Sequence, residues 1–222
     1  MTTATDVLLF VPNLIGYFRI LCTLSSFVIM LHMDKHWLIA ILLYILSFAG
    51  DLFDGMVARK LNQTSTYGSL LDMITDRCST LGLIYVLGVL QEPYRLLYLM
   101  LIILDISSHW CQMFSSMGSG HHKSKESNEG RNIIVRWYYQ YYAFFGYLCV
   151  GAEFTYIFQY ILLHCHQDYP PIIVTSITVL LHLVMPGCIM KQVVNVFQLS
   201  SACYLVANQD AKKYSNNSDK NL

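Results

Sequence analysis

Six long apolar segments constrain this chain more than any other feature of its sequence. A helix that crosses a bilayer needs about 20 mostly apolar residues. In lipid, backbone polar groups must be satisfied within the structure itself, which favours helices over open strands. We therefore expect an all-α polytopic membrane protein. Its six transmembrane helices are predicted at residues 14–31, 37–58, 68–90, 95–117, 137–163 and 172–195.

The composition agrees with a membrane protein. Only 13% of the residues are charged, whereas a soluble domain carries about 25%. Basic and acidic residues balance at 14 each, so net charge gives no argument for a nucleic-acid partner. The seven cysteines show no CxxC spacing, which predicts neither a zinc site nor a disulfide scaffold. The N-terminus lacks the basic region of a cleavable signal peptide, so the first segment is expected to stay.

The two ends of the chain differ from the apolar segments. Residues 6–12 form a short apolar stretch before the first span and are predicted to lie at the membrane interface. The tail at 208–222 is rich in Lys, Asn and Ser, a composition typical of disorder. We therefore predict one transmembrane domain over residues 1–207, followed by a disordered cytosolic tail.

Basic residues gather on one side of the predicted membrane. Cytoplasmic loops carry an excess of Lys and Arg, so the richer side should face the cytosol, with both termini. The poorer side holds only Lys35 and Arg95. Sequons at Asn62 and Asn216 would face the cytosol and stay unmodified. The richer side holds Arg59, Lys60, Lys123, Lys125, Arg131, Lys212, Lys213 and Lys220.

Acidic residues occur inside the apolar segments, where they are unfavourable. Insertion scales put an aspartate at a helix centre at about +2.5 to +3.5 kcal/mol. Acids in such places are functional by default. The alternative interpretation is that they reach the membrane surface. These acids are Asp51, Asp54, Asp72, Asp76, Asp105 and Glu153.

Four of these acids are predicted to converge. Asp51 and Asp54 are three residues apart, and Asp72 and Asp76 four apart, so each pair shares a helix face. The two helices are antiparallel neighbours joined by a short loop. At 1.5 Å per residue, Asp54 and Asp72 lie about 7–9 Å from that loop, and Asp51 and Asp76 about 14 Å. The two pairs are therefore level, near the cytosolic leaflet.

Converging carboxylates predict a metal site. Like charges in a small space must be protonated or neutralised by cations. Carboxylate oxygens suit Mg²⁺ or Mn²⁺ rather than zinc, and two such ions suit displacement at phosphorus. Gly55, Ala58 and Gly68 would let helices or a phosphate approach closely. The Arg59 fork suits phosphate, although an interfacial anchor is its alternative interpretation.

The spacing of these residues resembles a known signature. Asp51-x2-Asp54-Gly55-x2-Ala58-Arg59-x8-Gly68-x3-Asp72-x3-Asp76 matches that of the CDP-alcohol phosphotransferase superfamily at all eight positions. Residues 10–17, 71–80 and 108–110 further resemble the eukaryotic branch whose acceptor is myo-inositol.

The resemblance implies a reaction and a setting. Members of this branch react CDP-diacylglycerol with myo-inositol to give phosphatidylinositol and CMP. They are homodimers of the endoplasmic reticulum membrane, with the active site open to the cytosol. By position, Asp51, Asp54, Asp72 and Asp76 would ligate Mg²⁺ or Mn²⁺, and Asp76 would be the proton acceptor. The residues implied to bind CDP-diacylglycerol are Gly55, Ala58, Arg59, Ser65 and Gly68; the family commonly has Thr at Ser65.

The acceptor site is predicted on the fourth segment. Asp105 and His109 share a helix face, and Ser108 lies beside them. Together they could supply the donors and acceptors that a polyol needs, with a polar helix contact as the alternative. Arg19 is predicted near the nucleotide side of the pocket, and Glu153 in a helix contact.

Other functions stay open. A sister enzyme would use serine or glycerol phosphate as acceptor, but a phosphorylated acceptor would need a denser basic cluster than this chain shows. An ion transporter would show repeated halves with broken helices, which the sequence lacks. A non-catalytic lipid-binding scaffold would be expected to have lost part of the signature.

Overall fold

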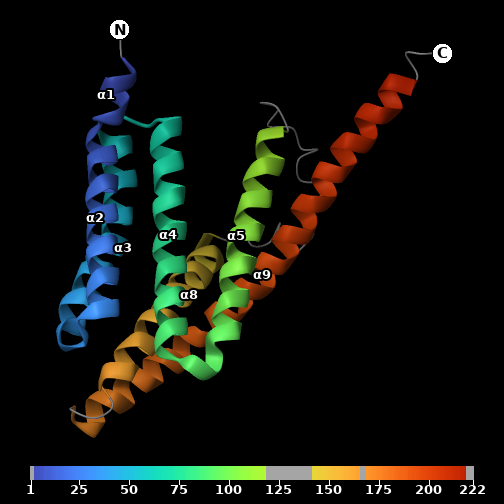
Figure 1. Cartoon of the computed structure of the whole chain (residues 1–222). Coiled ribbons are helices and arrows are strands. Elements are labelled where there is room, and N and C mark those ends of the chain that lie inside the picture. Colours follow the sequence, from blue (N-terminus) through green and yellow to red (C-terminus); the bar gives the residue numbers. More distant parts are fainter. Residues whose placement is uncertain (1–2, 119–141, 166–168, 219–222) are drawn as a thin grey trace. The chain divides into compact units, whose positions relative to one another are not determined.

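The protein is described by a computed structural model that covers residues 3–118, 142–165 and 169–218. Within these ranges it holds helices and no strand (Figure 1). The predictions for Lys123, Lys125, Arg131, Lys220 and the start of the fifth span lie outside the described residues. The elements in chain order are α1 (Ala4–Leu8), α2 (Val11–His32), η1 (Asp34–His36), α3 (Trp37–Lys60), α4 (Thr66–Leu90), η2 (Glu92–Tyr94), α5 (Arg95–Gly118), α8 (Tyr142–Cys165) and α9 (Pro171–Ser218).

The predicted all-α class and the six spans are confirmed. Six helices of the described chain are long and apolar enough to cross a membrane, and they follow the predicted segments in order. The predicted apolar stretch at 6–12 becomes the short helix α1 and the start of α2. All seven cysteines are free thiols, as their spacing predicted.

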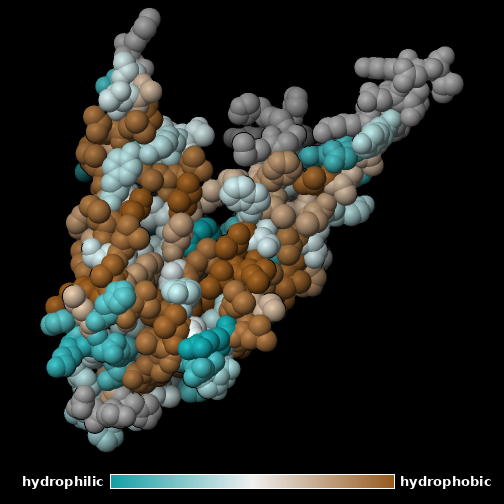
Figure 2. Space-filling view, in the orientation of Figure 1, coloured by the Kyte–Doolittle hydropathy of each residue, from teal (hydrophilic) through white to brown (hydrophobic). Residues whose placement is uncertain are grey.

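The surface of these helices is suited to lipid. Large apolar side chains are exposed along every span, among them Leu42, Leu96, Trp110 and Leu183. Figure 2 shows wide brown, hydrophobic areas along the helices. In water such patches would promote aggregation, whereas lipid tails solvate them. The molecule is therefore a multi-pass membrane protein.

The chain divides into two compact units, each described by itself. The first consists of Met1–Tyr98 and Tyr156–Ile177, and the second of Leu99–Thr155 and Thr178–Leu222. The first unit holds α1 to α4, and the second holds α5 with most of α8 and α9.

In the first unit, α2 packs against both α3 and α4. The Ser26 hydroxyl donates to the Ala40 carbonyl at 2.7 Å, and the rings of Phe27 and Tyr44 lie 6.1 Å apart. Phe27 lies over Gly82 of α4 so closely that any side chain at Gly82 would displace it. The three helices therefore form one tightly packed group.

The short connection between α3 and α4 sets the register of these two helices. α3 ends where Asn62 adopts a left-handed φ of 54°, a conformation that Asn tolerates well. The Gln63 amide then donates to the Ala58 carbonyl at 2.9 Å. Ser65 caps α4, with its hydroxyl accepting from the Gly68 amide at 2.9 Å. The chain thus reverses within five residues, so α4 runs antiparallel to α3, and α2 packs against both.

In the second unit, two glycines let α8 and α9 approach. A Cβ at Gly151 would lie 3.3 Å from the Gly187 Cα atom. The Tyr147 hydroxyl donates to the Leu183 carbonyl at 3.2 Å. Close approach through small residues is the usual way for helices to pack in lipid, where the hydrophobic effect gives no drive between them.

The predicted disordered tail is wrong for residues 208–218. There α9 continues as a helix through Ser218. A helix that already exists gains one hydrogen bond for each residue it adds. Ala, Gln and Lys residues in this stretch are also good helix formers. Polar composition alone therefore did not end the helix.

Candidate active site

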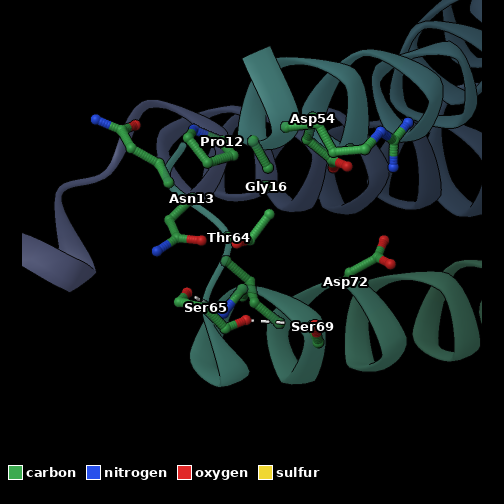
Figure 3. A pocket seen from close by; sticks show the side chains of 14 residues that line it. Pro12, Asn13, Gly16, Asp54, Thr64, Ser65, Ser69 and Asp72 are labelled. Carbon is green, nitrogen blue, oxygen red and sulfur yellow. Dashed lines mark hydrogen bonds between the residues drawn. The ribbon is translucent and has the colours of Figure 1, made fainter. Parts of the chain in front are cut away.

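The turn between α3 and α4 brings the predicted aspartates together. Asp51 and Asp54 come from the last turns of α3, and Asp72 and Asp76 from the first turns of α4. In Figure 3, Asp54 and Asp72 extend from opposite helices into the space between them. The predicted convergence of the two pairs is therefore present in the structure.

Arg19 of α2 binds all four carboxyl groups. Its Nη1 atom lies 3.1 Å from Asp51 Oδ1, 2.6 Å from Asp54 Oδ2 and 3.1 Å from Asp72 Oδ1. Its Nη2 atom lies 2.5 Å from Asp76 Oδ1. The Arg19 side chain is only 2% exposed. Nη1 donates hydrogen bonds to Asp54 and Asp72, and Nη2 donates one to Asp76. Asp51 is held as an ion pair. A planar guanidinium can engage several carboxylates in this way because its donors point in fixed directions.

The rest of the Arg19 side chain, from Cγ to Nε, is also held in place. Its Nε donates to the Ser47 carbonyl at 3.2 Å, and the Ser47 hydroxyl donates to the Arg19 carbonyl at 3.0 Å. Thr23 and Ser47 share a hydrogen bond at 2.7 Å. A Cβ at Gly50 would lie 2.8 Å from Arg19 Cγ, so the side chain crosses α3 where no side chain obstructs it.

Three of the aspartates are close enough to hold one metal ion. An oxygen from each of Asp51, Asp72 and Asp76 lies within 4.8 Å of the other two. The set is all-oxygen and anionic, which suits Mg²⁺ or Mn²⁺. Asp54 joins these residues through Arg19. The side chains therefore fit the predicted kind of metal.

A cavity of about 220 Å³ lies beside the aspartates (Figure 3). Asp54 and Asp72 form part of its wall, together with Pro12, Asn13 and Gly16 of α2. All five residues predicted to bind the CDP-lipid line it. They are Gly55, Ala58, Arg59, Ser65 and Gly68.

Glycine keeps the walls of this cavity close together. A Cβ at Gly68 would lie 3.0 Å from Asn13 Oδ1 and 3.2 Å from Ser65 Oγ. A Cβ at Gly16 would lie 2.8 Å from Leu71 Cδ2. Side chains at these two positions would push α2 away from α4. Glycine at these two positions therefore allows α2 and α4 to pack closely.

A sequence model of the CDP-alcohol phosphatidyltransferase family matches residues 9–167. This match includes Arg19, the four aspartates and every residue that lines the cavity. The chain belongs to the CDP-alcohol phosphatidyltransferase family.

Relatives of known name cover almost the whole chain. It is 35% identical to a CDP-diacylglycerol–inositol 3-phosphatidyltransferase of Candida albicans, over 95% of this chain and 87% of the relative. It is 36% identical to a probable CDP-diacylglycerol–inositol 3-phosphatidyltransferase of Arabidopsis thaliana, over 94% of each. It is 35% identical to the human protein of that name, over 93% of this chain and 95% of the relative. No solved structure matches the chain significantly.

Two polar residues that line the cavity, Asn13 and Gln63, carry no predicted role. Asn13 donates to the Val7 carbonyl at 2.5 Å, which ties α1 to α2. Gln63 accepts from the Val11 amide at 3.0 Å, which ties the start of α2 to the α3–α4 connection. The interruption of an apolar stretch by Pro12-Asn13 was the available signal, since a polar residue there needs a partner.

Arg19 has a more central place than its sequence position predicts. The sequence predicts it near the nucleotide side of the pocket, whereas the structure brings it to the aspartates themselves. An isolated arginine within the first apolar segment was the signal. A buried cation requires anionic partners, and the neighbouring segments supply them.

The predicted acceptor residues form a polar group on α5, within the second unit, in which His109 is partly exposed. Asp105 and Ser108 are buried. The Ser108 hydroxyl donates to the Asp105 carbonyl at 3.0 Å, and His109 Nδ1 lies 2.9 Å from the same oxygen. His109 Nδ1 also lies 3.6 Å from Asp105 Oδ1. Their role toward an acceptor stays a prediction, as does that of the buried Glu153 on α8.

Proposed function

We propose that this protein transfers the phosphatidyl group of CDP-diacylglycerol to myo-inositol, giving phosphatidylinositol and CMP. The observation that carries the proposal is the near-complete coverage of relatives named for this reaction, in fungi, plants and animals. The signature residues of the family also gather around one cavity in this chain.

In the proposed reaction an inositol hydroxyl attacks the phosphorus that carries diacylglycerol. The new P–O bond forms as the pyrophosphate bond to CMP breaks, and the hydroxyl proton passes to the Asp76 carboxylate. A neutral alcohol is a poor nucleophile, so a carboxylate within hydrogen-bond reach assists attack. Asp76 suits this role because it is one of the four clustered aspartates and its side chain is still 34% exposed.

Asp51, Asp54, Asp72 and Asp76 are proposed to hold Mg²⁺ or Mn²⁺, as two ions. Bound metal would neutralise the pyrophosphate and the departing CMP. The support is the all-oxygen donor set and the short distance between three of the carboxyl groups.

The cavity is proposed to bind the CDP part of the lipid donor. Arg59 offers a cation to phosphate, and Gly55 lies beside its guanidinium, since a Cβ there would lie 3.6 Å from Arg59 Nη1. Gly68 and Ala58 keep the walls thin, and Ser65 offers a hydroxyl at the start of α4. Asp105, Ser108 and His109 are proposed to contact inositol.

We propose the membrane orientation of the protein from the distribution of its charged residues and from the chemistry of its lipid substrate. Both termini and the site would face the cytosol, because the basic residues predominate on that side. The diacylglycerol tails would remain in the bilayer while the headgroup reacts. We further propose a homodimer in the endoplasmic reticulum membrane, as the family resemblance implies.

The proposal can be tested with purified protein in detergent micelles with Mn²⁺ or Mg²⁺. CDP-diacylglycerol is supplied with inositol, serine, glycerol phosphate or no acceptor, and CMP release is measured. We expect release that depends on inositol and on metal, and that chelation abolishes. Release with serine or glycerol phosphate alone would move the protein to a sister activity. No release with any acceptor, from a folded sample, would overturn the enzymatic proposal.

A further inference from the structure

We propose that Arg19 is a positioning residue that holds the four aspartates in a geometry ready for metal, without occupying the place of the metal. The inference rests on the proposed function only in taking these aspartates as the metal ligands. It does not depend on which alcohol is the acceptor.

The contacts of Arg19 fit a residue that organises ligands. Arg19 contacts two helices, since Asp51 and Asp54 belong to α3 and Asp72 and Asp76 to α4. Each contact ends on a single oxygen: Oδ1 of Asp51, Asp72 and Asp76, and Oδ2 of Asp54. A carboxyl group has two oxygens, so each aspartate can bind Arg19 through one and a cation through the other.

The surroundings of Arg19 hold it at a fixed position. Its Nε is bound to the Ser47 carbonyl, and its stem passes over Gly50, which has no Cβ to obstruct it. Ser47 is itself fixed by Thr23 of α2. A side chain anchored by its neighbours at Nε, with both Nη atoms engaged, is built to stay in place when a cation arrives.

Arg19 also reduces the repulsion within the site. Four carboxylates drawn together carry a formal charge of −4, and one guanidinium lowers it to −3. Like charges at this separation repel one another, and a partly buried site screens that repulsion less than bulk water does. Without Arg19 the carboxyl groups would spread apart or become protonated, and a metal ion would have to gather them again. Hydrogen-bond partners that hold metal ligands typically contribute about 10- to 100-fold to metal affinity.

The test measures Mn²⁺ binding and not turnover. Purified protein is titrated with Mn²⁺ while the electron paramagnetic resonance signal of free Mn²⁺ is followed, which gives Kd and the number of sites. Arg19→Lys keeps the positive charge but loses the planar fork. We expect its Kd to rise by about 10- to 100-fold, with the number of sites unchanged.

A second variant guards against failure of Arg19→Lys to fold. Gly50→Ala leaves every charge in place, but its Cβ would lie 2.8 Å from Arg19 Cγ and must displace the stem. We expect Kd to rise in the same direction, toward the lower end of that range. The matched controls are Arg95→Lys, an exposed arginine that pairs with Glu92, and Gly146→Ala, a glycine of α8 whose Cβ would meet no other atom of the described residues within 4 Å. Neither control should change Kd.

Three outcomes would overturn the inference. A lower Kd in Arg19→Lys would mean that Arg19 competes for the place of the metal. An unchanged Kd would mean that it does not organise the ligands. Fewer sites at an unchanged Kd would mean that Arg19 serves folding only. Failure of the proposed reaction would look different, because Mn²⁺ would still bind to the aspartates while no acceptor released CMP.

Discussion

At the scale of single residues, the site is a cluster of ion pairs between three helices, α2, α3 and α4. One buried arginine faces four aspartates, and none of the five would be favourable in lipid alone. Breaking a buried ion pair by removing one partner leaves an uncompensated charge. Each member of the group is therefore needed by the others, apart from any role in the chemistry.

Asp76→Asn tests the proposed base. The amide has nearly the same shape as the carboxyl group but cannot accept the proton of the inositol hydroxyl. We expect CMP release to fall by about 10²- to 10⁴-fold, the usual contribution of general-base catalysis. Glu92→Gln, an exposed acid that pairs with Arg95, is the matched control. Wild-type rates in Asp76→Asn would assign proton removal to another group.

Substitutions at Ser65 test its structural role as the N-cap of α4. Its hydroxyl caps α4, and loss of such a cap costs about 1 kcal/mol. We expect Ser65→Ala to lower the melting temperature in detergent, and Ser65→Thr to preserve it, because Thr keeps the hydroxyl. Thermal unfolding of both variants checks this. Equal stability of all three proteins would show that the cap contributes nothing.

At the scale of elements, function depends on how closely α2, α3 and α4 approach. Gly16, Gly50 and Gly68 lie where a side chain would collide with another helix or with Arg19. The α3–α4 connection then fixes the register, since Asn62 and Ser65 end one helix and begin the next. Small residues and a tight reversal together make the wall of the cavity.

Gly68→Ala tests the fit of the donor at this wall. The new Cβ would lie 3.0 Å from Asn13 Oδ1, so α2 must shift or the cavity must narrow. We expect the KM for CDP-diacylglycerol to rise by about 5- to 10-fold, or ~1–1.4 kcal/mol, with a smaller effect on the KM for inositol. Gly146→Ala should change neither. An unchanged KM for the lipid in Gly68→Ala would place the donor elsewhere.

At the scale of the whole molecule, the sequence indicates both that the chain inserts into a membrane and which way it faces. Six apolar spans commit the chain to a bilayer. The bias of Lys and Arg proposes which side faces the cytosol. A site close to one end of α3 and α4 would then let a lipid donor react while its tails stay in the membrane.

Thiol labelling tests the orientation. Thr64→Cys lies in the exposed α3–α4 connection, and Lys35→Cys lies in the exposed turn at the opposite end of α3. In sealed microsomes with the cytosolic face outward, an impermeant maleimide should label Thr64→Cys at once. It should label Lys35→Cys only after detergent is added. Unsubstituted protein gives the background of the native thiols, and the reverse labelling pattern would invert the proposed topology.

The sequence by itself determined the membrane class, the six spans and the pairing of the aspartates. These follow from local rules, because a bilayer fixes segment length and a helix fixes which residues share a face. Only the tertiary structure decided that Arg19 joins all four aspartates, because these contacts link residues between 32 and 57 positions apart. It also decided that Asn13 and Gln63 line the cavity, where Gln63 ties the start of α2 to a loop 52 positions away. Composition also mispredicted residues 208–218, since an established helix extended through a polar sequence. Spacing predicted which carboxyl groups gather, but only packing could show that Arg19 holds them together.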